Sequence, residues 1–147
     1  MAIRTILHDD NPLLRKKSRE VTEFNDRLHT LLDDMRETLI EADGAGLAAP
    51  QVGVLRRVAL VLNGDKVIEL INPVIMKTEG TCVEAEGCLS IPNIFGTVSR
   101  PYFVKVRAQD RMGNFFEVGG EGIVARALCH EIDHLDGVLF TDKVIEY

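Results

Sequence analysis

One stretch of the sequence decides the fold: Glu121-Gly122-Ile123-Val124-Ala125-Arg126-Ala127-Leu128-Cys129-His130-Glu131-Ile132-Asp133-His134-Leu135. Gly119-Gly120 precedes this stretch and Asp136-Gly137 follows it, so the pattern predicts a helix over 121–135. The apolar residues of this helix form two neighbouring stripes and leave only a narrow polar arc. Other elements usually enclose a helix of this kind, so we expect strands to wrap around it.

The middle of the chain has the pattern of β-strands. Apolar runs over 58–62, 67–71 and 102–106 are bounded by Asn, Gly, Asp and Pro. The segments Asn63-Gly64-Asp65 and Met112-Gly113-Asn114 are typical of tight hairpin turns. Such short connections indicate that neighbouring strands pair antiparallel.

A further helix is predicted over 25–42. Asn25 can cap its start and Gly44 can end it. Apolar residues at steps of three and four give this helix one face for the core: Leu28, Leu31, Leu32, Met35, Leu39 and Ile40. The expected fold class is therefore α+β, with antiparallel β-sheets packed around a central C-terminal helix, plus the N-terminal helix. Because no linker or repeat interrupts the chain, residues 1–147 are expected to form a single domain.

The composition excludes several classes of protein. The 147 residues include 17 Lys and Arg against 23 Asp and Glu, which gives a formal net charge of −6. A nucleic-acid ligand is not expected, because the longest basic run is Arg15-Lys16-Lys17. No apolar run approaches the roughly 18 residues that span a bilayer, and the N-terminus lacks the apolar core of a secretion signal. We therefore expect a cytoplasmic protein without a membrane partner.

The segment His130-Glu131-Ile132-Asp133-His134 matches the pattern H-E-x-x-H. On a helix, this pattern places two imidazoles one turn apart, where both can bind one metal ion, with Glu131 beside them as a general base. The alternative is a helix with surface histidines. We disfavour it because both imidazoles lie on an apolar stripe, where unpaired polar groups would cost desolvation energy.

A catalytic metal site needs a third protein ligand and an open position for water. Two patterns of metal peptidases would supply that ligand downstream of His134, and neither is complete. Phe140 stands where one pattern has a His, and Glu146 is the sole Glu after His134. The third ligand should therefore come from upstream, where the candidates are Cys82, Cys88 and Cys129, with His8 and His29 less favoured.

Cys88 is the preferred candidate. Cys129 points about 100° away from His130 around the helix, and Cys82 lies in what reads as an ordinary strand. Cys88 lies in Glu86-Gly87-Cys88-Leu89-Ser90-Ile91-Pro92, which is typical of a turn with exposed backbone amides. Glu86 and Arg100 are candidates for an ion pair that braces this turn, and the alternative is two solvated charges.

A third notable segment is Gly44-Ala45-Gly46-Leu47-Ala48-Ala49-Pro50-Gln51. By itself it is consistent with a helix C-cap and a tight loop of small residues. Its functional interpretation is a backbone that approaches a ligand closely, with Gln51 as an amide donor. The segment alone does not decide between the two.

Together, the segments Gly44–Gln51, Glu86–Ser90 and His130–Gly137 resemble the three signature motifs of the peptide deformylase family, in the same order and at similar spacing. The resemblance extends over nearly the whole chain. It implies removal of the formyl group from the initiator methionine of new polypeptides, with release of formate. The implied partners are N-formylmethionyl peptides.

The resemblance also implies roles for individual residues. Cys88, His130 and His134 would hold one divalent metal, usually Fe(II) in that family, with zinc, nickel or cobalt as substitutes. Glu131 would be the general acid and base.

Further residues would act on the substrate. Gln51 and the backbone N–H of Leu89 would bind the developing oxyanion, and Gly46 would align the substrate backbone. From the facing of the helix and the proximity of the motifs, we expect the remaining pocket residues to be Ala45, Ile123, Ala127 and Phe95.

Two other functions remain open at this point. One is a zinc peptidase that uses H-E-x-x-H on whole peptide bonds, and the other is a metal-binding module without catalytic activity. Some relatives dock to the ribosome through a further basic C-terminal helix. This chain ends at Lys143-Val144-Ile145-Glu146-Tyr147, so we expect ribosome binding to be weak or to use another surface.

Overall fold

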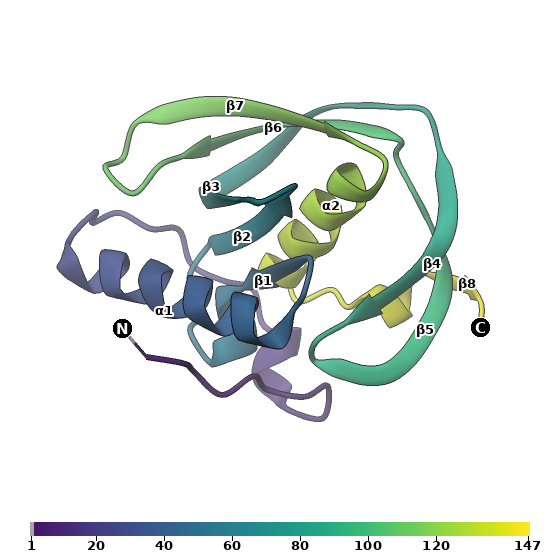
Figure 1. Cartoon of the computed structure of the whole chain (residues 1–147), viewed down its shortest axis with the longest axis horizontal. Helices are drawn as coiled ribbons and strands as arrows, with labels where there is room; N and C mark the ends of the chain where they lie inside the picture. The colour runs from purple at the N-terminus through teal and green to yellow at the C-terminus, as the bar shows by residue number, and fades with distance from the viewer. Residues whose placement is uncertain (1) are drawn as a thin grey trace.

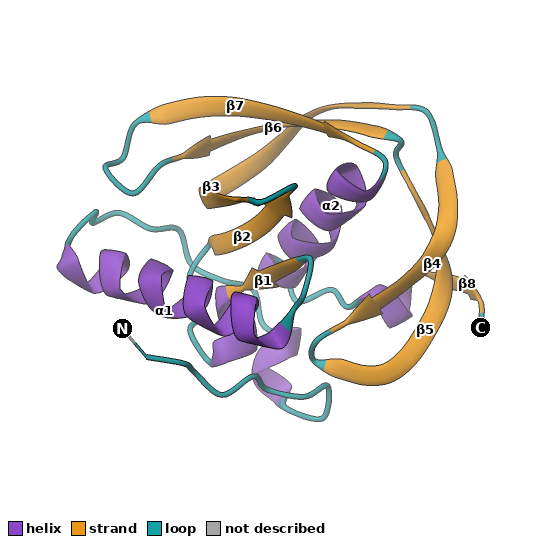
Figure 2. Cartoon of the chain, viewed as in Figure 1, coloured by secondary structure: helices purple, strands orange, loops and turns teal. Residues whose placement is uncertain are grey.

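The computed structural model describes residues 2–147, which form two α-helices, eight β-strands and three short 3-10 helices (Figure 2). The α-helices are α1 (Asp26–Ala42) and α2 (Ile123–Leu135). The strands are β1 (Gly46–Ala48), β2 (Val58–Asn63), β3 (Lys66–Glu79), β4 (Cys82–Cys88), β5 (Ile91–Arg100), β6 (Phe103–Gln109), β7 (Phe115–Glu121) and β8 (Val144–Glu146). The 3-10 helices are Pro12–Arg15, Ala49–Val52 and Phe140–Asp142. The prediction of two helices and antiparallel sheets is confirmed.

Two antiparallel sheets enclose α2 (Figure 1). The larger sheet has the strand order β1-β2-β3-β6-β7, and the smaller has the order β4-β5-β8. In the figure, α2 lies between the larger sheet and the long β4–β5 hairpin, while α1 lies on the other side of β1 and β2. Ten of the thirteen residues of α2 are buried. Neither helix in residues 2–147 is long and apolar enough to cross a membrane.

The alternation of side chains along β2 explains why both helices pack on the same sheet. Val58 and Leu60 belong to the apolar cluster that contains the buried face of α1. Val61 belongs to the cluster that contains the buried face of α2. Because successive side chains of a strand point to opposite faces, a continuous apolar run is buried on both faces of the sheet.

The structure corrects three details at the ends of the helices. The predicted helix over 121–135 begins at Ile123, because Glu121 is the last residue of β7. The N-terminal helix is capped by Asp43, which has φ of 55°, and not by Gly44. Ile40 was predicted to face the core but is 63% exposed. It follows the buried Leu39 by about 100° around the helix and so points away from the sheet.

Strand β3 is longer than predicted. The pattern predicted an end near Ile71, before Asn72-Pro73, yet the strand continues to Glu79. Asn72 has φ of 53°, and the register shifts between Ile71 and Val74, so Pro73 falls at an irregularity where its missing N–H costs no ladder hydrogen bond. The amide side chain of Asn72 accepts from the N–H of Val21 and donates to the carbonyl of Val21, which stabilises this conformation.

Candidate metal centre

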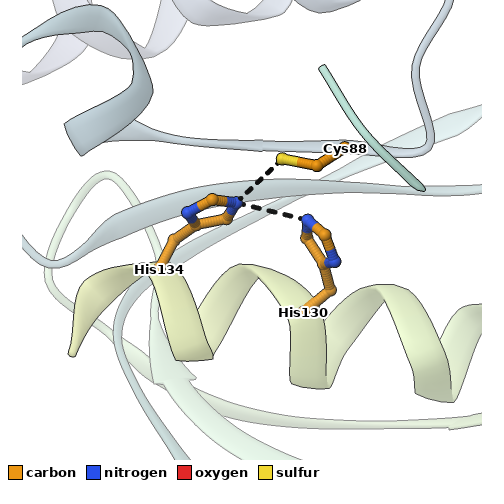
Figure 3. A group of neighbouring side chains, drawn as sticks. All are labelled: Cys88, His130 and His134. Carbon is orange, nitrogen blue, oxygen red and sulfur yellow. Dashed lines mark hydrogen bonds between the residues drawn. The ribbon is translucent and has the colours of Figure 1, made fainter. Parts of the chain in front are cut away.

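Three side chains with metal-binding atoms meet between α2 and β4 (Figure 3). His130 and His134 lie one turn apart on α2, and their Nε2 atoms are 3.2 Å apart. Cys88 is the last residue of β4, and its Sγ lies 3.3 Å from Nε2 of His134. One donor atom from each of the three residues lies within 4.8 Å of the other two. Within residues 2–147, the other candidates do not join this group: Cys82, Cys129, His8 and His29.

The β4–β5 hairpin presents Cys88 to the helix. Only Leu89 and Ser90 connect the two strands, and the register shifts between Glu86 and Cys88. A side chain at Gly87 would place its Cβ 2.7 Å from the ring of Phe95. Glycine at this position therefore lets Phe95 pack over the hairpin close to Cys88.

A buried carboxylate orients His130. Oε2 of Glu86 lies 2.6 Å from Nδ1 of His130, so Nδ1–H donates to the carboxylate and Nε2 is turned toward Cys88 and His134. Arg100 donates to the same carboxylate from Nε at 3.0 Å and from its terminal nitrogen at 2.6 Å. The side chains of Glu86 and Arg100 are 4% and 3% exposed. The alternative of two solvated charges is wrong, and the expected ion pair is present.

Two charged residues that the sequence analysis did not single out complete this network. Arg126 donates to Oε1 of Glu86 at 2.8 Å, and Arg100 donates to Oδ2 of Asp133 at 2.7 Å. Arg126, His130 and Asp133 are spaced four and three residues apart, so they share one face of α2. This spacing was a usable signal in the sequence, because three polar residues on one face of an apolar helix imply polar partners.

The electrostatics of the two imidazoles fit a cation at this position. Burial disfavours a charged imidazole, but the charge of Glu131 and hydrogen bonds to Cys88 and Glu86 outweigh it and raise the pKa of His130 to about 10. Burial and the charge of His130 together hold the pKa of His134 well below its usual range. The pair of imidazoles therefore holds one positive charge, on His130, and does not take up a second one on His134. A thiol and two imidazoles with this behaviour fit a divalent metal ion.

Glu131 lies beside these residues in a buried position. Burial raises the pKa of its carboxyl to about 7. Within residues 2–147, its Oε1 has no hydrogen-bond partner. A Cβ at Gly46 of β1 would lie 2.6 Å from Oε2 of Glu131. The absence of a side chain at Gly46 therefore makes room for this carboxyl group.

Gln51 and Leu89 both lie next to Cys88. Oε1 of Gln51 accepts from the N–H of Ala48 at 2.9 Å, which fixes the orientation of the amide. Its Nε2 donates to Oγ of Ser90 at 3.0 Å and lies 3.6 Å from Sγ of Cys88. Leu89 follows Cys88 directly in the hairpin turn. The NH₂ group of Gln51 thus faces the Cys88 side chain.

A cavity of about 480 Å³ opens beside two of the three donor residues, Cys88 and His130. Its lining includes the predicted pocket residues Ala45, Gly46, Phe95, Ile123 and Ala127, together with Gln51, Cys88, Leu89, His130 and Glu131. The structure therefore brings all of these predicted residues to one cavity. The side chains of Ile123 and Phe95 are 75% and 67% exposed, so they lie at its mouth. An apolar cavity with a few convergent polar groups is the usual form of a small-ligand site.

Comparisons with known proteins agree over nearly the full chain. The pattern of the polypeptide deformylase family matches residues 3–147. A peptide deformylase from Alkaliphilus metalliredigens is 59% identical over 146 residues, which cover 99% of each chain. Another, from Caldicellulosiruptor bescii, is 56% identical over 147 residues, which cover all of this chain and 89% of that one.

Solved structures of similar proteins have the same fold. The crystal structure of peptide deformylase from Thermotoga maritima superposes with a TM-score of 0.95 at 39% identity and covers 98% of this chain and 99% of that chain. A peptide deformylase from Synechococcus elongatus, solved in complex with actinonin, has a TM-score of 0.91 at 37% identity, covering 95% of this chain and 77% of that chain.

Fold and site together define a hydrolase with a mixed arrangement of helices and antiparallel sheets. Within that class, the chain belongs to the polypeptide deformylase family. Proteins of this family are metalloenzymes that remove the N-formyl group from nascent polypeptides.

Proposed function

We propose that this protein hydrolyses the formyl group of N-formylmethionyl peptides and releases formate. The observation that carries the proposal is the convergence of Cys88, His130 and His134 at one point, next to a cavity that is lined by Cys88, His130 and the buried Glu131. We also propose that residues 1–147 act as one catalytic domain. This is supported by the site, to which β1, β4 and α2 all contribute.

Cys88, His130 and His134 would hold the metal. A sulfur ligand with two imidazoles suits first-row metals such as Fe(II), zinc, nickel and cobalt, and we propose Fe(II) as the ion in use. When bound, the ion supplies Lewis-acid chemistry, which lowers the pKa of a water molecule and polarises a carbonyl oxygen. Glu86 supports this ligand set because it holds Nδ1 of His130 and leaves Nε2 free to bind.

Glu131 would move the protons. Its carboxyl accepts a proton from the attacking water and returns it to the nitrogen that leaves with the peptide. Burial raises the pKa of this carboxyl, which helps the group to hold the accepted proton until it is passed on.

Gln51 and the backbone N–H of Leu89 would donate hydrogen bonds to the oxyanion. The bond from Ala48 to Oε1 of Gln51 supports this role, because it holds the NH₂ group on the side of Cys88. In other enzymes, a donor aimed at an oxyanion contributes about 3 kcal/mol to the stability of the transition state.

The cavity would bind the methionine side chain and the first peptide bonds. Ala127 provides an apolar wall, Phe95 and Ile123 narrow the mouth, and Ala45 lies beside the entrance. Gly46 would align the substrate backbone. A flexible, unbranched side chain such as methionine can fill an irregular apolar cavity.

The test is release of formate from a formyl-Met peptide by metal-free protein that has been loaded anaerobically with Fe(II), zinc, nickel or cobalt. The control substrate is the same peptide without the formyl group. We expect formate from the formylated peptide and no cleavage of the control. Cleavage of the control peptide at a peptide bond would instead indicate a peptidase. Metal binding without either reaction would indicate a module without catalytic activity.

A further inference from the structure

Arg126 connects α2 to both strands of the β4–β5 hairpin. It donates to Oε1 of Glu86 at 2.8 Å, to the carbonyl of Val98 at 3.0 Å and to the carbonyl of Cys82 at 2.8 Å. Cys82 begins β4, Glu86 lies near its end, and Val98 lies on β5. One guanidinium group thus joins the helix to three separate points of the hairpin.

The same carboxylate joins Arg126 to the metal centre. Arg126 lies one helical turn before His130, so both side chains leave α2 on the same face and reach Glu86. Arg126 binds Oε1 and His130 binds Oε2, which attaches the carboxylate to α2 at two places. Glu86 is also only two residues before Cys88 on β4. We propose that Arg126 is a positioning residue: it fixes the hairpin on α2 so that Cys88 and His130 have the spacing that metal binding requires.

Burying the charges of Arg126 and Glu86 costs desolvation energy, which favours a role in positioning residues over a role in stabilising the fold. The side chains of Arg126 and Glu86 are 9% and 4% exposed, so both charges have lost most of their water. Buried ion pairs of this kind often contribute little to stability compared with apolar residues of similar volume, because their desolvation is costly. Their hydrogen bonds are directional, however, and the planar guanidinium group can bind several acceptors at set angles.

A lysine at position 126 cannot make the three hydrogen bonds that Arg126 makes. An ammonium group presents a single point charge, and it cannot serve the three acceptors in the fixed arrangement of the guanidinium nitrogens. The three acceptors here belong to two different strands. An Arg126→Lys variant should therefore keep the charge near Glu86 but hold the hairpin less firmly.

The inference rests on the proposed metal-dependent function, and its test uses metal binding as the main measurement. Arg126→Gln is compared with Arg57→Gln. Arg57 is a suitable control because it also fastens α2, through the carbonyl of Leu135 and Oδ1 of Asp136 at 3.0 Å each, without a bond to Glu86. Zinc affinity is measured by competition with a coloured chelator. The spectrum of the cobalt-loaded protein reports the bond between the metal and the Cys88 sulfur.

We expect Arg126→Gln to lower zinc affinity by about 10- to 100-fold, the range usual when the residues that orient a metal ligand are disturbed, because Arg126 holds Glu86, the partner of His130. In the cobalt-loaded Arg126→Gln protein, the sulfur-to-cobalt charge-transfer band should weaken or shift. Arg57→Gln should lower the melting temperature by about as much as Arg126→Gln does. Its zinc affinity should nevertheless stay within about twofold of the unsubstituted protein. The zinc affinity of Arg126→Lys should lie between those of the two glutamine variants. If Arg126→Gln does not fold, Arg126→Lys provides the same comparison.

The outcomes separate this inference from the proposed function. If the unsubstituted protein binds no zinc or cobalt through Cys88, the proposed function itself fails. If it binds metal and both Arg126 variants bind equally well, or if Arg57→Gln weakens binding as much, only the role of Arg126 is overturned.

Discussion

The two helices are attached to the strands by different kinds of contact. The side of α1 toward the larger sheet packs through apolar residues: Leu32, Met35 and Leu39 cluster with Leu47 and Leu60. The face of α2 toward the β4–β5 hairpin instead carries charged and polar groups that bind Glu86 and Arg100.

The two kinds of contact affect different properties: the apolar contacts of α1 mainly set the stability of the fold, and the ionic contacts of α2 mainly set distances and angles at the site. Apolar packing depends on the area removed from water and is not directional. A buried ionic network adds little stability but restricts distances and angles. We therefore expect substitutions on the buried face of α1 to change the free energy of unfolding alone, and substitutions between α2 and the hairpin to change catalysis or metal binding as well.

The largest effect on catalysis is expected for Glu131→Gln. The amide has nearly the same shape as the carboxyl group but cannot accept and return a proton, so kcat should fall by roughly 10²- to 10⁴-fold. The metal content should stay unchanged, because Glu131 is not among the three donor residues. The measurement is formate release together with metal analysis of the same sample. A variant that lost its metal would show that Glu131 is a ligand, which would contradict the assigned role.

Leu32→Ala tests the apolar side of the comparison. Leu32 lies on the buried face of α1 and is fully buried, so its truncation should lower the free energy of unfolding by about 2–5 kcal/mol. Urea denaturation measures this change. Well below the melting temperature, kcat and zinc affinity should match those of the unsubstituted protein. A large loss of kcat in the folded variant would mean that packing under α1 also controls the site.

Gly46→Ala should disturb the site only through a steric clash with Glu131. The added Cβ would lie 2.6 Å from Oε2 of Glu131, so the carboxyl group must move. Misplacement of a catalytic group by about 1 Å can cost up to about 100-fold in rate. The matched variant is Gly44→Ala, whose Cβ would meet Cδ1 of Leu89, the far end of a flexible side chain. We expect a clearly smaller loss of kcat there, and equal losses would count against the steric explanation.

The smallest expected effect concerns an ionic network beside α1. Partial burial alone raises the pKa of Glu69, but hydrogen bonds from Arg111 and Arg36 outweigh it and hold this pKa below its ordinary value of 4.5. The ion pairs therefore stabilise the fold fully above that value, and the contribution is lost as the pH falls through the lower pKa of the folded state. Because the network is partly solvated, Glu69→Gln should cost about 1 kcal/mol or less at pH 7.

The measurement is urea denaturation of Glu69→Gln and the unsubstituted protein at pH 7 and at pH 3. The difference between the two proteins should shrink at the lower pH. A difference that stays constant between these pH values would show that the carboxylate charge is not what stabilises this region.

Much of the fold follows from local patterns. The apolar periodicity gave both helices, and Asn63-Gly64-Asp65 gave the β2–β3 hairpin, because these signals need only neighbouring residues. The extension of β3 beyond Pro73 was missed. It depends on the bonds of Asn72 with Val21, which is 51 residues away and carries no local signal.

The residues of the site also fall into those that a local sequence pattern predicted and those that it did not. The two His residues and Glu131 form one contiguous motif, and their spacing predicted that they would meet. The network of Arg126 was missed, although the spacing on α2 was visible. Its partners lie 28 to 44 residues away on β4 and β5, and the sequence does not show which face of the helix these strands cover.

The enclosure of α2 has a consequence for the motions of the protein. A helix that is buried on most sides cannot open locally without separating the sheets that cover it. Its amide hydrogens should therefore exchange with solvent mainly through global unfolding and should be among the slowest in the chain. Because α2 carries His130, Glu131 and His134, the most persistent part of the fold is also the site itself. The cavity should then keep its shape between turnovers, and adaptation to different peptides is left to the exposed side chains at its mouth.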